Sequence, residues 1–234
     1  MNIKEFIEEL KRINIEINEK QLEQLNKYYE LLCIWNEKIN LTRIVKKEDV
    51  YLKHFYDSAT LNYIIELNNI ENICDFGTGA GFPGIVIKIL FPKIHITLVD
   101  SLNKRINFLN EVIKELDLKN IEAVHSRIED YAKENREKYD LVVARAVASL
   151  NILLEYSAPI IKINKNFVAM KANIDEELEN CKNAMQKLSL ELVDRKEFIL
   201  PKEESKRNLL LFKKKKATEK KYPRSSSEIK KKPL

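Results

Sequence analysis

The residues with the clearest capacity for chemistry lie in one short glycine-rich stretch. The 234-residue chain has four glycines, and all of them lie there: Gly77, Gly79, Gly81 and Gly84. The stretch follows an apolar run, and Pro83 suits the first turn of a helix, where its missing N–H costs nothing. Glycine lets a ligand lie against bare backbone, and a helix N-terminus offers free N–H groups. The stretch therefore predicts a nucleotide-type cofactor site at the carboxyl end of a strand.

Two cofactor classes fit the spacing of this loop. Gly79-x-Gly81-x-x-Gly84 satisfies the dinucleotide fingerprint. An acid followed by alternate glycines, from Asp75 to Gly81, equally fits the loop of S-adenosylmethionine enzymes. The Asp75 carboxylate would repel a pyrophosphate but tolerates the cationic amino group and sulfonium of S-adenosylmethionine. Asp100 ends the next expected strand, where an acid accepts hydrogen bonds from ribose hydroxyls with either cofactor. The residues favour the methyl donor, bound by Asp75, Gly79 and Asp100, and leave a dinucleotide open.

The other reactive side chains indicate no metal site. The three cysteines, Cys33, Cys74 and Cys181, lie far apart, which excludes a disulfide scaffold and argues against a zinc ribbon. Cys74 lies within an expected strand and is interpreted as packing. His54 and Asp57 form a close pair, but no third or fourth ligand is near them. We expect this pair to form an interdomain hydrogen bond or a helix cap, with positioning of RNA or of a base as the alternative.

The elements that position the loop follow from residue 71 onward. Short β-branched runs alternate with helical ones, which indicates crossover units. Strands are expected at 73–76, 94–99, 121–125, 139–143, 167–170, 190–197 and 207–212. Helices are expected after Pro83 and at 102–116, 150–161 and 174–188. The pattern predicts an α/β fold with a doubly wound, mostly parallel seven-stranded sheet, closed by an antiparallel edge hairpin.

Three segments are expected along the chain. Residues 1–68 show helical spacing of apolar residues and form an N-terminal helical extension. Residues 69–213 form the cofactor-binding domain. Residues 214–234 have almost no apolar content, so we expect a basic tail that is disordered in isolation.

The charge of the chain is concentrated in that tail. Residues 213–234 hold ten Lys or Arg and two Glu, a net charge of +8, whereas the whole chain carries +5, so residues 1–212 carry −3. Such asymmetry indicates a polyanionic partner for the tail. No apolar run approaches the roughly 18 residues of a membrane span, and the N-terminus lacks a secretory signal. We expect a cytoplasmic protein, monomeric and without a membrane partner.

Several short motifs occur in a fixed order along the chain. They are Trp35-Asn36, Asn40-Leu41-Thr42, His54-x-x-Asp57-Ser58, the loop from Asp75 to Gly84, Val99-Asp100-Ser101-Leu102-x-Lys104-Arg105-x-x-Phe108-Leu109, and Arg145-Ala146. With these motifs, the chain resembles the bacterial ribosomal RNA small subunit methyltransferase G family, also called glucose-inhibited division protein B. The resemblance extends from about residue 5 to the tail.

The resemblance implies a Rossmann-like class I methyltransferase that uses S-adenosylmethionine. Its implied target is N7 of a guanosine in the 530-loop region of 16S ribosomal RNA, offered as RNA or as a 30S particle. By the same resemblance, Gly77 and Phe82 would contact the methyl donor, and Ile128 and Glu129 would hold its adenine. Arg145 would lie near both the cofactor and the target base.

The chemistry of guanine N7 sets a modest demand on the protein. N7 carries a lone pair and no proton, so its methylation needs alignment and exclusion of water but no general base. A fixed cation beside the base would oppose the positive charge that methylation brings, unless it binds an oxygen. We therefore expect Arg145, the one candidate catalytic residue, to bind O6 or a phosphate.

Other functions remain open from the residues alone. A nicotinamide-dependent oxidoreductase would use the Gly79–Gly84 fingerprint, although Asp75 and the basic tail count against it. A non-catalytic RNA-binding assembly factor could retain the same fold. Among methyltransferases, DNA and protein acceptors also fit. An exocyclic amine acceptor is disfavoured, because residues 144–147 lack a polar-Pro-Pro-aromatic loop.

Overall fold

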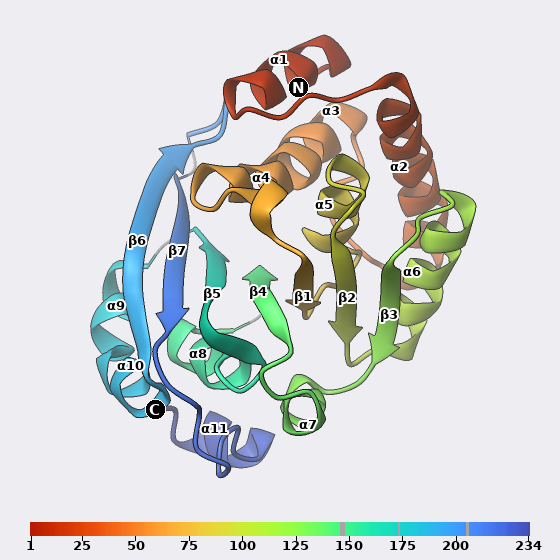
Figure 1. The fold of residues 1–234 in the computed structure, drawn as a ribbon. Helices are drawn as coiled ribbons and strands as arrows, with labels where there is room; N and C mark the ends of the chain where they lie inside the picture. Colours follow the sequence, from red (N-terminus) through yellow and green to blue (C-terminus); the bar gives the residue numbers. More distant parts are fainter. Residues whose placement is uncertain (146–147, 173, 205) are drawn as a thin grey trace.

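A seven-stranded sheet forms the centre of the molecule. The computed structural model describes residues 1–145, 148–172, 174–204 and 206–234. The strand order is β3-β2-β1-β4-β5-β7-β6 (Figure 1). The strands are β1 (Asn72–Phe76), β2 (His95–Asp100), β3 (Ile121–His125), β4 (Tyr139–Arg145), β5 (Ile161–Lys171), β6 (Leu190–Ile199) and β7 (Lys206–Lys214).

Strand direction places the site at one edge of this sheet. β1 to β5 run parallel, whereas β7 is antiparallel to β5 and to β6. From β1 the chain builds outward through β2 to β3, then returns to place β4 on the other side of β1. This reversal leaves a crevice at the carboxyl ends of β1 and β4, where ligands bind in doubly wound sheets.

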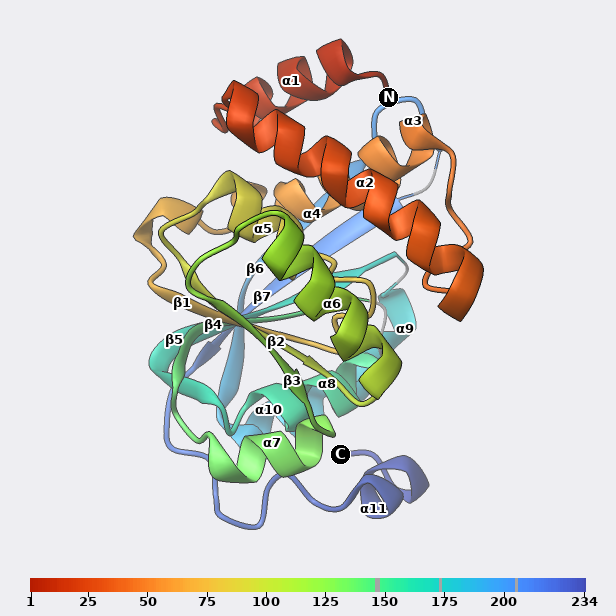
Figure 2. The ribbon, with the colours of Figure 1, turned by 90° about the vertical axis from the view of Figure 1, so that its right-hand side faces the viewer.

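Helices cover both faces of the sheet (Figure 2). One face carries α1 (Ile3–Arg12), α2 (Glu19–Ile39), α5 (Gly84–Leu90) and α6 (Asn103–Glu115). The other carries α7 (Ile128–Glu134), α8 (Leu150–Ser157), α9 (Asp175–Asn180), α10 (Lys182–Leu188) and α11 (Ser226–Lys231). A separate apolar core lies under each set of helices, because the strands are buried on both sides.

The N-terminal helices pack directly onto the cofactor-loop side of the sheet. α1 and α2 each begin with an Asn capping box, which satisfies free N–H groups of the first turn. The Gln21 side chain donates to the carbonyls of Ile89 at 2.7 Å and Leu90 at 3.1 Å, at the end of α5. The buried Tyr28 hydroxyl donates to the carbonyl of Ala80, within the glycine loop. α2 thus supports the loop from behind.

A further helical segment connects these helices to β1. It begins with α3 (Lys47–Val50) and passes through a π-helical stretch at Tyr51–Tyr56 into α4 (Asp57–Ala59). Two 3₁₀ turns follow, at Thr60–Tyr63 and Leu67–Asn69. Its side chains are mostly buried, and it carries the expected His54 and Asp57 pair. His54 and Asp57 both face the edge of the sheet, where they contact Arg145 at the end of β4.

The sheet prediction is confirmed, including its mostly parallel order and the antiparallel hairpin of β6 and β7 at the edge. Two helix predictions differ from the structure. α7 was not expected between residues 121–125 and 139–143, because its seven residues give too short a pattern. The helix expected at 174–188 is two helices, α9 and α10, interrupted at Cys181.

The tail also differs from expectation, because residues 214–234 do not form a disordered segment in the structure. Lys214 ends β7, and α11 forms near the C-terminus. Tyr222 and Ile229 are buried in the core beneath α8. The few apolar residues of the tail are therefore placed where they pack, which low average hydrophobicity does not reveal.

No helix among the described residues is long and apolar enough to cross a membrane.

Candidate functional site

The glycine loop is shaped by the carboxylate below it. Asp75 Oδ2 accepts hydrogen bonds from Thr78 Oγ1 at 2.7 Å and from the Gly84 N–H at 2.8 Å, which ties both ends of the loop together. A Cβ on Gly84 would lie 2.2 Å from Leu98 Cδ2, so only glycine allows this approach. Gly79 has φ +62°, and a Cβ there would meet nothing closer than a carbonyl at 4.0 Å. The loop is therefore closed toward the sheet and open on its outer side.

Asp75 itself lies beneath the loop. It is completely buried and lines neither of the cavities beside the loop. Burial raises the pKa of its carboxyl to about 7, and Oδ1 has no hydrogen-bond partner among the described residues. The structure thus places Asp75 where it holds the loop, whereas the sequence predicted a residue beside the cofactor.

Asp100 is the carboxylate that faces the open side. It ends β2, and its oxygens accept from the N–H groups of Gly79 and Leu102, each at 2.9 Å. Arg105 Nη1 lies 3.2 Å from Oδ2. These donors fix the carboxylate at the rim of the crevice, where an acid can accept hydrogen bonds from ribose hydroxyls.

Two cavities flank this carboxylate. Cavity A, of about 370 Å³, is lined by residues that include Gly77, Gly79, Phe82, Asp100 and Arg145. Cavity B, of about 250 Å³, is lined by residues that include Gly77, Asp100, Ile128, Glu129, Ser226 and Lys230. Gly77, Asp100 and Ser101 line both cavities, so the two are adjacent. All the site residues expected from the sequence except Asp75 thus lie around one continuous crevice.

A third cavity lies on the other side of Arg145. Cavity C, of about 360 Å³, shares Arg145 and His54 with cavity A, and these two side chains form the partition. Its wall includes Asp57, Arg207 and Asn208. Four separate parts of the chain therefore meet here: the segment before β1, the end of β4, the end of β5 and the start of β7.

Arg145 is held in place by contacts with the N-terminal part of the chain. Its Nη1 donates to Asp57 Oδ2 at 3.0 Å and to the Lys53 carbonyl at 3.2 Å. Its guanidinium carbon lies 5.2 Å from the centre of the Phe82 ring, a cation–π contact. The other Asp57 oxygen accepts from Arg207 Nε at 3.1 Å. Asp57 therefore joins the cations of β4 and β7.

His54 is a neutral part of the same partition. Its ring stacks on Phe82 with centroids 4.4 Å apart and an interplanar angle of 16°. Burial, with a contribution from nearby Arg145, lowers the pKa of His54 from 6.5 to about 3. Arg145 Nη2 lies 3.3 Å from His54 Nδ1 and can only donate, so Nδ1 accepts. Nε2 then carries the proton and donates to Thr42 Oγ1 at 3.0 Å.

The pair of His54 and Asp57 thus makes hydrogen bonds between the N-terminal segment and the sheet, the first of the two roles expected for it. Within the described parts of the chain, no cluster of three or more His, Cys, Asp or Glu could hold a metal ion. Burial raises the pKa of the Cys74 thiol well above its usual value, consistent with packing.

Several residues at this site were missed from the sequence. Arg207 and Asn208 line cavity C, and Ser226 and Lys230 line cavity B. They lie more than 100 residues beyond the glycine loop, in strands and helices with no motif of their own. Only the basic charge of the tail indicated a functional role there.

Cavities A and B fit an adenosyl donor. The open face of Gly79 leaves room against bare backbone, and Asp100 supplies an acceptor for hydroxyl groups at the junction of the two cavities. Ile128 and Tyr156 give cavity B an apolar surface suited to a flat ring. The residues present therefore fit an adenosyl group.

Comparison with known sequences points to one group of proteins. A family model described as rRNA small subunit methyltransferase G matches residues 21–210. A protein of Lysinibacillus sphaericus (strain C3-41) named ribosomal RNA small subunit methyltransferase G is 49% identical over 237 residues, covering 100% of both chains. The protein of the same name in Bacillus subtilis (strain 168) is 48% identical, covering 100% of this chain and 99% of its own.

Solved structures share the fold at low sequence identity. The M. jannaschii protein TYW2, in complex with AdoMet, aligns with a TM-score of 0.53 and 17% identity, covering 63% of this chain and 70% of its own. Precorrin-6y C5,15-methyltransferase from Geobacter metallireducens GS-15 aligns with a TM-score of 0.51 and 14% identity, covering 73% and 90%. These similarities support the fold assignment alone.

Proposed function

The chain belongs to the rRNA small subunit methyltransferase G family, and from this membership and the site we propose that it methylates N7 of a guanosine in the 530-loop region of 16S ribosomal RNA. S-adenosylmethionine is the methyl donor and supplies an electrophilic methyl group. The observation that carries the proposal is the partition of Arg145 and His54, with cavity A on one side and cavity C on the other. Donor and target base can approach each other at this partition.

Cavities A and B form the donor side. Gly77 and Gly79 offer backbone against which the donor lies, and Phe82 forms part of the wall of cavity A. Asp100 accepts hydrogen bonds from the ribose hydroxyls. Ile128 and Glu129 line cavity B and hold the adenine. Asp75 acts from beneath by fixing the loop.

Cavity C is the acceptor side, and its residues position the base without taking a proton. Guanine N7 already has a free lone pair, so the reaction depends on alignment and exclusion of water. The pKa of about 3 keeps His54 neutral, and Asp57 is occupied by two arginines, which suits a site without a general base.

Arg145 positions the base through an oxygen. A guanidinium has five N–H donors, and the contacts with Asp57, Lys53 and His54 use three of them in the described part of the chain. Two donors are left for guanine O6 or a phosphate. An Arg145→Lys enzyme with unchanged kcat/KM would contradict this role, because an ammonium has neither the planar fork nor its reach.

Asn208 provides a candidate acceptor in the wall of cavity C. Its Nδ2 donates to the Ala172 carbonyl at 2.7 Å, and a carbonyl can only accept, so the identity of the two amide atoms is fixed. Asn208 Oδ1 has no partner among the described residues, although the residue is only 2% exposed. This oxygen is buried in the structure, and we propose that the exocyclic amino group of guanine supplies its missing donor when the Asn208 side chain turns toward cavity C.

The substrate class and the charge distribution agree. Residues 213–234 hold ten Lys or Arg, and such residues give affinity for phosphate that depends on salt and little on sequence. We propose that the protein acts in the cytoplasm as a monomer on 16S ribosomal RNA or on a 30S particle. Selection of a single nucleotide then rests on cavity C.

Transfer of labelled methyl groups tests this function. Small-subunit RNA from cells that lack the gene is incubated with the protein and labelled S-adenosylmethionine, and its nucleosides are then separated. We expect label in 7-methylguanosine and none in base-methylated adenosine or cytidine. A melting shift with NAD but none with S-adenosylhomocysteine would instead support the dinucleotide alternative. Shifts with S-adenosylhomocysteine but no transfer would support a non-catalytic factor.

A further inference from the structure

We propose that the C-terminal helix α11 is part of the donor site, and that Ser226 and Lys230 bind the adenosyl group of S-adenosylmethionine. The proposal rests on the proposed function for the identity of the donor. It assigns to the tail a role in donor binding that is separate from any contact with RNA.

The first observation is the wall of cavity B. Ser226 and Lys230 line this cavity together with residues 126–129, which follow β3. The two residues are four positions apart in α11, so their side chains lie on the same face of the helix. Ile229 is fully buried and packs against the core beneath α8. The helix is therefore oriented with its buried edge on the core and this face toward the cavity.

The second observation is the strength of the anchor. Glu155, in α8, is completely buried, and Arg224 Nε lies 2.8 Å from Oε1 and Nη2 lies 2.6 Å from Oε2. The Arg224 N–H adds a third bond to Oε1 at 3.0 Å. If the tail left the surface, a buried carboxylate would lose these partners, which is strongly unfavourable. The tail therefore belongs to the folded enzyme.

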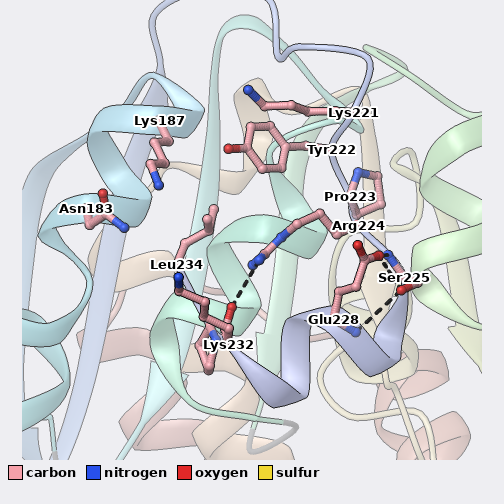
Figure 3. Close-up of a pocket in the computed structure, with 11 residues that line it drawn as sticks. Asn183, Lys187, Lys221, Tyr222, Pro223, Arg224, Ser225, Glu228, Lys232 and Leu234 are labelled. Carbon is pink, nitrogen blue, oxygen red and sulfur yellow. Dashed lines mark hydrogen bonds between the residues drawn. The ribbon is translucent and has the colours of Figure 1, made fainter.

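Further contacts fix the segment on both sides of Arg224. Arg136 donates to the Tyr222 carbonyl at 2.8 Å and also to the Thr218 carbonyl. The Arg224 Nη1 donates to the Lys232 carbonyl at 3.0 Å, and Ser225 and Glu228 form the cap of α11 (Figure 3). α11 is thus held at its start by a capping box and at its end by Arg224.

The chemistry of the two side chains matches an adenosyl group. The ring nitrogens of adenine accept hydrogen bonds, an ammonium can only donate, and a hydroxyl can do either. In the part of the chain that the structure describes, the Lys230 ammonium has no hydrogen-bond or ion-pair partner. Glu129 lines the same cavity and pairs with Arg127, with 3.9 Å between Oε1 and Nη1. Lys230 lines cavity B, whereas the sulfonium of the donor belongs in cavity A. The two positive charges therefore lie in different cavities.

Calorimetric titration with S-adenosylhomocysteine tests the proposal without requiring transfer. The test variants are Lys230→Ala and the double variant Ser226→Ala/Lys230→Ala. The matched controls are Lys231→Ala and Ser227→Ala/Lys231→Ala, because these neighbours lie on the same helix but line neither cavity A nor cavity B. We expect Kd to rise about tenfold in the double test variant, the effect of one or two hydrogen bonds, and to stay within about twofold in the controls.

A parallel titration with a 530-loop RNA fragment separates donor binding from RNA binding. The test and control variants remove the same charge, so we expect equal losses of RNA affinity. Equal Kd values for S-adenosylhomocysteine in test and control variants would overturn the proposal. An unmodified enzyme that binds neither S-adenosylhomocysteine nor S-adenosylmethionine would instead refute the proposed function itself. Unfolding midpoints in urea confirm that each variant is folded.

Discussion

Arg145 and Asp57 form an ion pair with a separation of 3.0 Å between Nη1 and Oδ2, although 88 residues separate them in sequence. Arg145 ends β4, and Asp57 begins α4 in the segment before the sheet. The pair is largely buried, with side-chain exposures of 17% and 7%. It joins the N-terminal part of the chain to the sheet at the partition between cavities A and C, so the same contact stabilises the fold and orients the proposed catalytic arginine.

The substitution Asp57→Asn should therefore affect stability and activity together. A neutral amide at this position could not offset the charges of Arg145 and Arg207, both of which Asp57 contacts. We expect the free energy of unfolding in urea to fall by about 1–3 kcal/mol, the usual cost of leaving buried charged donors without their partner. Methyl transfer should fall as Arg145 loses its orientation.

Asp49→Asn is the matched control for this change. Asp49 lies in the same helical segment but is 43% exposed, and its contact with Lys53 is 3.9 Å long. Such exposed pairs contribute little, so we expect a change within about 0.5 kcal/mol. An Asp57→Asn protein as stable as this control would show that the ion pair does not join the two parts.

Gly79→Ala should weaken donor binding without unfolding the protein. The new Cβ would meet nothing closer than 4.0 Å, so it would occupy space on the open side of the loop. We expect the Kd for S-adenosylhomocysteine to rise at least about tenfold. The positive φ should also reduce stability by about 1–2 kcal/mol.

Asn164→Ala separates these two effects. Asn164 has φ 65°, close to the 62° of Gly79, and is exposed in β5, outside the cavities described above. We expect a similar kind of strain and no change in donor affinity. Unchanged donor affinity in Gly79→Ala would mean that the donor does not lie against this part of the loop.

The stability of the protein should depend on pH through His54. The pKa of His54 is about 3 in the folded protein, against 6.5 for a free histidine side chain. Between these values the unfolded state binds the proton and the folded state does not, so stability falls as pH decreases from 6.5 toward 3. Asp75 has the opposite effect between pH 3.8 and about 7, because its pKa is raised to about 7 in the folded protein. It therefore masks the dependence of stability on pH that His54 produces.

Comparison of variants isolates the contribution of His54. The stability advantage of the unmodified protein over His54→Gln should be largest above pH 6.5 and should shrink by up to about 1.4 kcal/mol per unit as pH falls. His95→Gln serves as the control, because His95 is exposed in β2. An advantage of His54 that is constant from pH 7 to pH 4 would show that the folded protein accepts the proton.

Asn208 should determine preference for the amino group of guanine. RNA with inosine at the target position lacks that group, and we expect the unmodified enzyme to prefer guanosine by about tenfold in kcat/KM. In Asn208→Leu this preference should fall below about twofold, because the acceptor is gone. Donor affinity should be unchanged, since Asn208 lines cavity C and not cavity A or B. A variant that keeps the tenfold preference would exclude this role.

The sequence predicted the parts of the fold that have local patterns. β-branched runs and the glycine loop located the strands and the crevice, because side-chain periodicity and backbone freedom are local properties. α7 was missed because seven residues contain too few turns to show a period. The packing of α11 on the core was not predicted, because it depends on the burial of Ile229 and on the contact of Arg224 with Glu155, 69 residues away.

The candidate site could be predicted only in part for a similar reason. Asp100, Phe82 and Arg145 lie in motifs and line the crevice. Asp75 lies in the same motif but is buried below the loop, because sequence spacing does not distinguish the two sides of a tight turn. Asn208 reaches cavity C only because β7 inserts between β5 and β6, a topology that spacing does not reveal.

Guanine N7 is tested as the methyl acceptor by transfer to small-subunit RNA that carries either guanosine or 7-deazaguanosine at the single mapped target position. We expect one methylated site in the 530-loop region with guanosine and no transfer with 7-deazaguanosine, because the latter has a C–H in place of the N7 lone pair. Transfer at full rate to the 7-deaza RNA, or label mapped outside this region, would contradict this expectation.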